Sequence, residues 1–188
     1  TGAGVVIAQF FGAGNTCKMK RAIHNSIALT LVMGVVLTIV GLLFNDPILK
    51  AIGVPSEVFS EASTYLSIYF WSLIFVMVYN MGSGILRSVG DSKRPLYFLI
   101  FSSVVNIILD FLFVKYFHFG VAGAGYATLI AQAISAIMVM YVLMKTEDDY
   151  KVILKEIGFD KEILLKIIKI GLPTGFQQSI VSLSNVIV

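Results

Sequence analysis

The sequence predicts an all-α, polytopic bundle of transmembrane helices, from its composition, the spacing of its charges and the pattern of its apolar runs. Of its 188 residues, 57% are hydrophobic and 13% are charged, whereas soluble domains contain about 45–50% apolar and about 25% charged residues. The charged residues are clustered, and long apolar runs separate the clusters. Because these runs do not alternate between polar and apolar residues, they predict helices rather than the strands of a membrane barrel.

Four of the apolar runs are long enough to cross a bilayer, which takes about 20 mostly apolar residues in a helix. Turn and helix-start signals that include Pro47, Pro55 and Pro95 separate them. The apolar residues at the two ends of the chain, 1–11 and 171–188, have the composition of incomplete spans, so we expect a piece of a longer protein. The four complete spans are predicted near residues 23–44, 58–86, 95–114 and 121–144.

Basic residues are unequally divided between the two sides of the predicted bundle. Alternating connections place every Lys and Arg on one side except Lys50 and Lys115. The positive-inside rule assigns the basic side to the cytoplasm, so the formal net charge of +3 reflects membrane topology. We therefore expect membrane lipid as a partner, no nucleic acid and no obligate protein partner.

A strongly charged stretch of mixed sign, residues 145–169, follows the last complete span. Within it Ile163 and Ile167 share one helical face with two further aliphatic residues, opposite the charged side chains. This pattern predicts an amphipathic helix along the cytoplasmic surface, and we interpret the stretch as a linker between two lobes. The expected parts are an N-terminal lobe over 1–144, the linker over 145–169 and the start of a C-terminal lobe over 170–188.

One acidic residue, Asp110, lies within a predicted span. A carboxylate in that position costs about 2.5–3.5 kcal/mol on insertion scales, so it indicates function by default. Asn106 and Ser102 precede it by one and two helical turns and share its face. An alternative is that Asp110 reaches the membrane interface and pairs with Lys115 or His118.

The neighbouring spans carry polar rows of their own, which include Thr128 and Gln132 on one span and Tyr65 and Asn80 on another. Facing rows of this kind can line one cavity that holds water and a cation. The chain shows no cluster of metal-ligating residues, no nucleophile triad and no carboxylate pair. We therefore expect neither an enzyme nor an organic cofactor.

Five motifs lie along the chain: AQFFGAG at residues 8–14, LRSVGDSKRP at 86–95, NIILD at 106–110, GVAGAGYAT at 120–128 and GLP at 171–173. In this order and with this spacing they resemble the multidrug and toxic compound extrusion (MATE) family. The resemblance implies a twelve-helix transporter made of two six-helix lobes. This chain is similar to the part from the end of the second span to the start of the seventh.

The resemblance implies a multi-pass protein of the plasma membrane that exports amphipathic or cationic drug-like compounds in exchange for Na⁺ or H⁺. It places a cation site, with Na⁺ as one expected metal, at Asp110, Asn106 and Thr128. Tyr65 and Asn80 match polar positions of the fourth span, and with Gln132 they are the candidate substrate-cavity residues.

Two other functions remain open at this point. A lipid-linked oligosaccharide flippase of the same superfamily would need a cationic cavity for pyrophosphate, whereas the four complete spans contain no Lys or Arg. A membrane scaffold or receptor would leave Asp110 without a role. Ion-dependent extrusion of a dye from vesicles would separate these functions.

Overall fold

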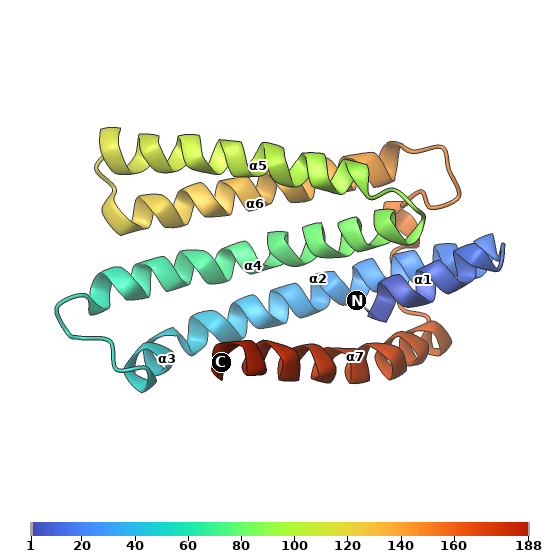
Figure 1. The fold of residues 1–188 in the computed structure, drawn as a ribbon, viewed down its shortest axis with the longest axis horizontal. Helices are drawn as coiled ribbons and strands as arrows, with labels where there is room; N and C mark the ends of the chain where they lie inside the picture. The colour runs from blue at the N-terminus through green and yellow to red at the C-terminus, as the bar shows by residue number, and fades with distance from the viewer. Residues whose placement is uncertain (1, 188) are drawn as a thin grey trace.

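A computed structural model describes the backbone of residues 2–187 and the side chains of residues 2–177 and 180. Residues 1 and 188, at the outer ends of the two predicted lobes, lie outside the described residues. Within the described range the chain is helical and contains no strand (Figure 1). The α-helices are α1 (Gly2–Gly12), α2 (Thr16–Leu43), α3 (Asn45–Ala51), α4 (Phe59–Ser88), α5 (Lys93–Phe111), α6 (Gly120–Lys145) and α7 (Lys161–Ile187).

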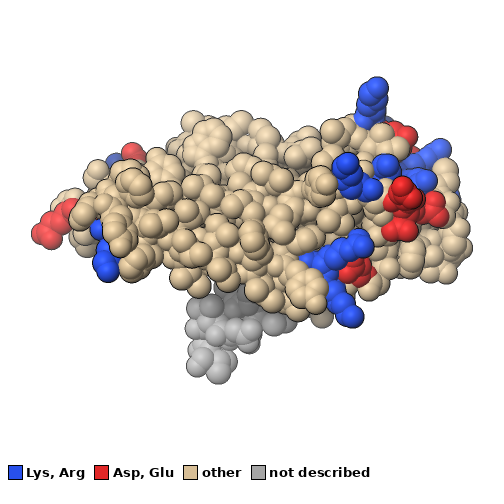
Figure 2. Space-filling view, turned by 90° about the horizontal axis from the view of Figure 1, so that it is seen from above, with Lys and Arg blue, Asp and Glu red and all other residues tan. Residues whose placement is uncertain are grey.

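Four helical segments are long and apolar enough to cross a membrane, and they confirm the four predicted spans. They comprise α2, α4, α5 together with the π-helical turn η1 (Leu112–Tyr116), and α6. Outward-facing residues of α5 such as Leu96, Ile100 and Ile107 are more than half exposed. On the face shown in Figure 2, a broad band without charged residues crosses the middle of the molecule, as lipid contact requires.

Polar side chains accept backbone hydrogen bonds at the starts of α2 and α5. At the start of α2, the Asn15 side-chain oxygen accepts a hydrogen bond from the Lys18 N–H at 3.0 Å, which satisfies a free donor of the first turn. Asp91 accepts from the Arg94 N–H at 3.1 Å at the start of α5. Between α4 and α5, Gly90 has a φ of 92°, a backbone conformation that favours glycine.

Helix α6 lies between α4 and α5 (Figure 1), and small residues allow this close packing. A Cβ at Gly125 would lie 3.2 Å from Ile68 of α4, and a Cβ at Gly123 would lie 3.1 Å from Phe113 of η1. Helices in lipid associate through such close approach, because the bilayer gives apolar side chains little reason to leave it. These glycines set the distance of α6 from both neighbours.

The charged stretch differs from the prediction of a separate surface helix over 145–169. Residues 146–160 form an irregular connection with one 3₁₀ turn, η2 (Leu154–Glu156). Helix α7 begins at Lys161 and continues through Pro173. The aliphatic face of its first turns is buried, with Ile163 and Ile167 each 5% exposed in the core that includes α1 and α2. Other helices of the bundle cover this face, and the position of the stretch at the membrane surface stays a prediction.

Helices α1 and α7 pack against each other (Figure 1). Gly2 of α1 and Gly171 of α7 meet backbone to backbone, and a Cβ on Gly2 would collide with Gly171. The division of the chain into two lobes and a linker stays a prediction.

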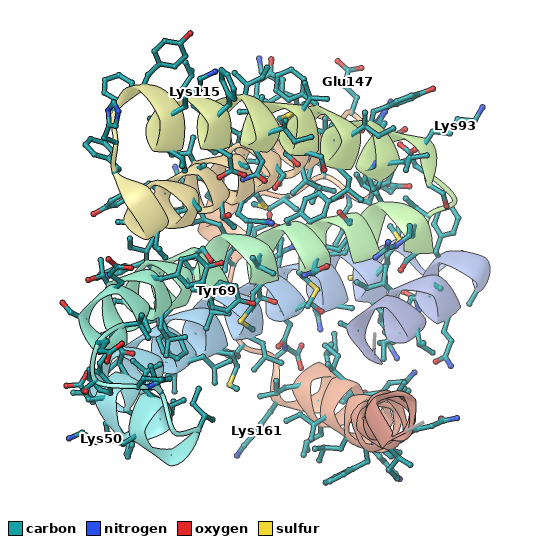
Figure 3. The ribbon with its side chains drawn as sticks, turned by 60° about the vertical axis from the view of Figure 1, so that its left-hand side comes forward. Lys50, Tyr69, Lys93, Lys115, Glu147 and Lys161 are labelled. Carbon is teal, nitrogen blue, oxygen red and sulfur yellow. The ribbon has the colours of Figure 1, made fainter. Side chains whose placement is uncertain are left out.

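The charged residues lie at the two ends of the bundle (Figure 2). Lys50 and Lys115 lie at one end, and Lys93 and Glu147 lie at the other (Figure 3). This separation is what the predicted topology requires. The assignment of the basic end to the cytoplasm stays a prediction.

The contact between α4 and α6 gives a direct test of the packing. A Cβ at Gly82 would lie 2.8 Å from both Cγ atoms of Val139. We expect Gly82→Ala to lower the free energy of unfolding by about 1–3 kcal/mol, the usual cost of overpacking. Thermal unfolding of the full-length protein in detergent measures this effect.

The matched control is Gly84→Ala, because no heavy atom lies within 4 Å of a Cβ at Gly84. Alanine in a helix is favoured over glycine by about 0.5–1 kcal/mol, so this variant should be at least as stable as the original protein. Equal stability of the two variants would contradict the close packing of α4 and α6.

Candidate cation and substrate site

Asp110 lies in the last turn of α5, immediately before η1. Its side chain is half-buried, and its Oδ1 atom is fully buried without a hydrogen-bond partner in the described part of the chain. An unpartnered buried polar atom costs about 1–3 kcal/mol, and more if it is charged. The position is therefore one where a bound cation or proton would stabilise the protein.

The alternative pairing of Asp110 with Lys115 or His118 is not found among residues 2–177. The Lys115 ammonium lies over the Phe111 ring, 4.6 Å from its centre. The His118 Nδ1 atom lies 3.1 Å from the Tyr116 carbonyl oxygen. No Lys, Arg or His nitrogen in this part lies within 4.0 Å of the Asp110 carboxylate.

Asn106 and Thr128 come together between α5 and α6, as the sequence predicted. The Asn106 Nδ2 atom donates to the Thr128 Oγ1 atom at 3.5 Å, and the Thr128 hydroxyl donates to the Ala124 carbonyl at 3.0 Å. Asn106 lies one helical turn before Asp110, so amide, hydroxyl and carboxylate oxygens lie in one region, and oxygen ligands are what hard cations prefer.

The end of α5 changes its helical form directly after Asp110. In η1 the Phe117 N–H bonds to the Leu112 carbonyl five residues earlier, at 3.1 Å. The rings of Phe113, Phe117 and Phe119 pack at centroid distances of 5.7–6.0 Å around this turn. Single π-helical turns are frequent at functional sites, and this one holds the end of α5 against Gly123 of α6.

The three predicted substrate-cavity residues lie in different places. Gln132 is half-buried, one turn after Thr128 on α6. Tyr65 is 37% exposed on α4, one turn before Tyr69 (Figure 3). Asn80 is exposed near the other end of α4. In the described part of the chain no hydrogen bond joins any of these three side chains to Asp110.

Asn80 lines a cavity of about 510 Å³ between α1, α2 and α4. Sequence reasoning missed two features of this cavity, the contribution of α1 and the presence of Arg87. Arg87 lies two helical turns after Asn80 on α4, and this spacing was the available signal. The lining residues are Gly4, Val5, Ala8, Thr30, Met77, Asn80, Met81, Gly84, Arg87 and Ser88.

Comparison with known proteins now identifies the family. The family model described as MatE matches residues 1–112, more than half of the chain. The chain belongs to the MatE family. This membership confirms the predicted fold. The chain is an all-α membrane bundle that forms part of a twelve-helix, two-lobe MATE transporter. Members of the family are transporters, so the expectations of a multi-pass membrane protein and of a protein other than an enzyme are confirmed as well.

Several MATE relatives match along nearly the whole chain. The probable multidrug resistance protein YoeA of Bacillus subtilis is 32% identical over 100% of the chain and 42% of its own length. The multidrug export protein MepA of Staphylococcus aureus is 31% identical over 95% of the chain and 40% of its own length. The chain thus spans about two fifths of the length of these relatives.

Solved structures agree with this MATE assignment. A crystal structure of a MATE protein in the bent conformation is 31% identical, with a TM-score of 0.88 over 94% of this chain and 40% of that chain. A MOP superfamily transporter from Pyrococcus furiosus is 31% identical, with a TM-score of 0.86 over 94% of this chain and 39% of that chain. The arrangement of α1–α7 is therefore that of the corresponding part of a MATE protein.

A double-mutant cycle tests the contact between α5 and α6 at this site. Thr128→Val removes the hydroxyl that accepts from Asn106 and should lower the free energy of unfolding by about 0.5–1.5 kcal/mol. In an Asn106→Ala background the same substitution should cost less, because the two residues share one interaction. Chemical unfolding of the four full-length proteins measures the difference. Strictly additive effects would contradict the contact.

Proposed function

We propose that the full-length protein is a cation-coupled multidrug efflux transporter that works by alternating access. The observation that carries the proposal is the buried, unpartnered Oδ1 atom of Asp110, one turn from the Asn106–Thr128 contact. The names of the relatives YoeA and MepA support multidrug transport. The MATE family supports ion coupling in general terms.

Asp110, Asn106 and Thr128 are the proposed cation site. A carboxylate held in apolar surroundings is costly while it is charged, so binding of Na⁺ or H⁺ there stabilises the conformation that buries it. The conformation that opens the site to water has less need of the ion. This difference in affinity is what allows an ion gradient to shift the conformational equilibrium.

The cavity beside Asn80 is the proposed start of the substrate path, with Tyr65 and Gln132 further along it. Val5, Met77 and Met81 give this cavity an apolar lining, to which Asn80 adds an amide. Methionine side chains adapt to irregular apolar surfaces, which suits a site that accepts drug-like compounds of different shape. We propose amphipathic, often cationic small molecules as substrates, and lipid as the surrounding partner.

A flippase for lipid-linked oligosaccharides has less support. Pyrophosphate recognition calls for several positive charges or bidentate Arg contacts. Of the residues that line the cavity between α1, α2 and α4, Arg87 is the one cation, and it lies at the exposed end of α4. No observation on the described residues favours this function over drug export.

The central prediction concerns Asp110→Asn in the full-length protein. The amide keeps the size of the carboxylate but carries no negative charge that could bind a cation. We therefore expect ion-driven dye efflux to be abolished while membrane insertion is retained. Efflux from vesicles under an imposed Na⁺ or H⁺ gradient measures the activity, and exchange of the two ions identifies the coupling ion.

The matched control is Asp148→Asn, which changes an exposed carboxylate in the connection between α6 and α7. The hydrogen bond from the Thr146 hydroxyl lowers the pKa of Asp148, and this residue lies outside the spans. Its substitution should leave efflux near the original rate. The proposed site would be refuted if cells that carry Asp110→Asn were as drug-resistant as cells with the original protein.

A further inference from the structure

His24 is a buried histidine in α2 whose two ring nitrogens are both engaged. The residue is 3% exposed. Its Nδ1 atom lies 2.7 Å from the Lys20 carbonyl oxygen, and its Nε2 atom accepts a hydrogen bond from the Ile153 N–H at 2.9 Å. A carbonyl oxygen only accepts and a backbone N–H only donates. The ring is therefore neutral, with its proton on Nδ1.

Ile153 belongs to the connection between α6 and α7, and neighbouring contacts fix the same connection to α2. Lys20 forms an ion pair with Asp149 at 3.5 Å, and Arg21 forms one with Asp160 at 3.7 Å. The buried side chain of Asn25 donates to the Asp160 carbonyl at 2.7 Å. Residues 149–160 are thus held against the first turns of α2.

The contact with Ile153 is special among these because it requires an unprotonated ring nitrogen. A proton on Nε2 would face the Ile153 N–H, and two donors repel each other. The Glu156 carboxylate lies 3.9 Å from the same Nε2 atom. One ring nitrogen thus has two partners in the same connection, a backbone donor that binds the neutral ring and an acid that binds the charged ring.

We propose that His24 is a proton-operated latch for the connection between α6 and α7. The neutral ring holds Ile153 and keeps residues 149–160 docked on α2. Protonation breaks that bond, transfers the ring to Glu156 and releases the backbone before α7. Histidine is the side chain whose charge ordinarily changes between about pH 5 and 8, so protonation is the event that would operate this latch.

The charges around the ring support this exchange of partners. Lys20 and Arg21 lie one turn before His24 on α2, but each is paired with an acid of the connection. Glu156 is 56% exposed and has no ion pair other than the one with His24 among residues 2–177. It is therefore the acid available to receive the charged ring. Cys17, Lys20, Arg21, Glu156 and Asp160 line a cavity of about 400 Å³ with His24.

Hydrogen exchange of the full-length protein tests the latch without a transport assay, so its failure is distinct from failure of the proposed function. The measurement follows the peptide that contains Ile153 at about pH 8 and about pH 5, with rates corrected for intrinsic exchange. We expect protection in the original protein to fall by about fivefold at the lower pH, the change that corresponds to loss of one typical hydrogen bond.

Three variants separate the latch from other effects of pH. His24→Gln places a carbonyl oxygen near the position of Nε2, so protection should be retained and become independent of pH. Glu156→Gln should move the loss of protection to lower pH, because the charged ring then lacks its acid. His118→Gln changes the exposed histidine at the other end of the bundle and should leave the response intact.

Several results would overturn the proposal. Equal protection at both pH values in the original protein would show that protonation does not release the connection. A pH response that persists in His24→Gln, or that disappears in His118→Gln, would assign it to another group. Thermal unfolding of His24→Gln confirms that this variant is folded, and His24→Ala should lose protection at both pH values.

Discussion

The main physical constraint on this bundle is a polar atom that is buried among membrane helices without a hydrogen-bond partner. Lipid contains no water that could satisfy such an atom, and the protein supplies no donor to the Asp110 Oδ1 atom in the described part of the chain. The neighbouring Asn106 amide instead directs its hydrogens toward Thr128. The site is thereby rich in oxygen and poor in donors, which supports the proposed binding of a cation there.

Close helix packing holds this costly site in place. Ile68 of α4 packs closely against Gly125 on one side of α6, and Phe113 packs closely against Gly123 on the other side. Thr128 follows Gly125 by one turn, so the same packing that joins three helices fixes the hydroxyl toward Asn106. The glycine-rich start of α6 therefore serves helix contact.

The sequence could predict what depends on local periodicity and length. Apolar runs located the four spans, and spacing by four residues placed Asn106 and Asp110 on one face. Periodicity shows that a face is apolar but not what covers it, and for this reason the pattern of the first turns of α7 does not reveal their contact with α1. The contact of His24 with Ile153 joins residues 129 positions apart, a pairing that no local pattern encodes.

The meeting of Gly2 and Gly171 has a thermodynamic consequence for how α7 is attached. Glycine has no side-chain rotamers to lose, so main-chain contact at this crossing incurs no side-chain entropy. The attraction between the two helices there comes from dispersion between two bare backbones, an interaction that also operates in lipid, where no hydrophobic effect drives helices together. The junction therefore does not depend on the hydrophobic effect that holds water-soluble domains together.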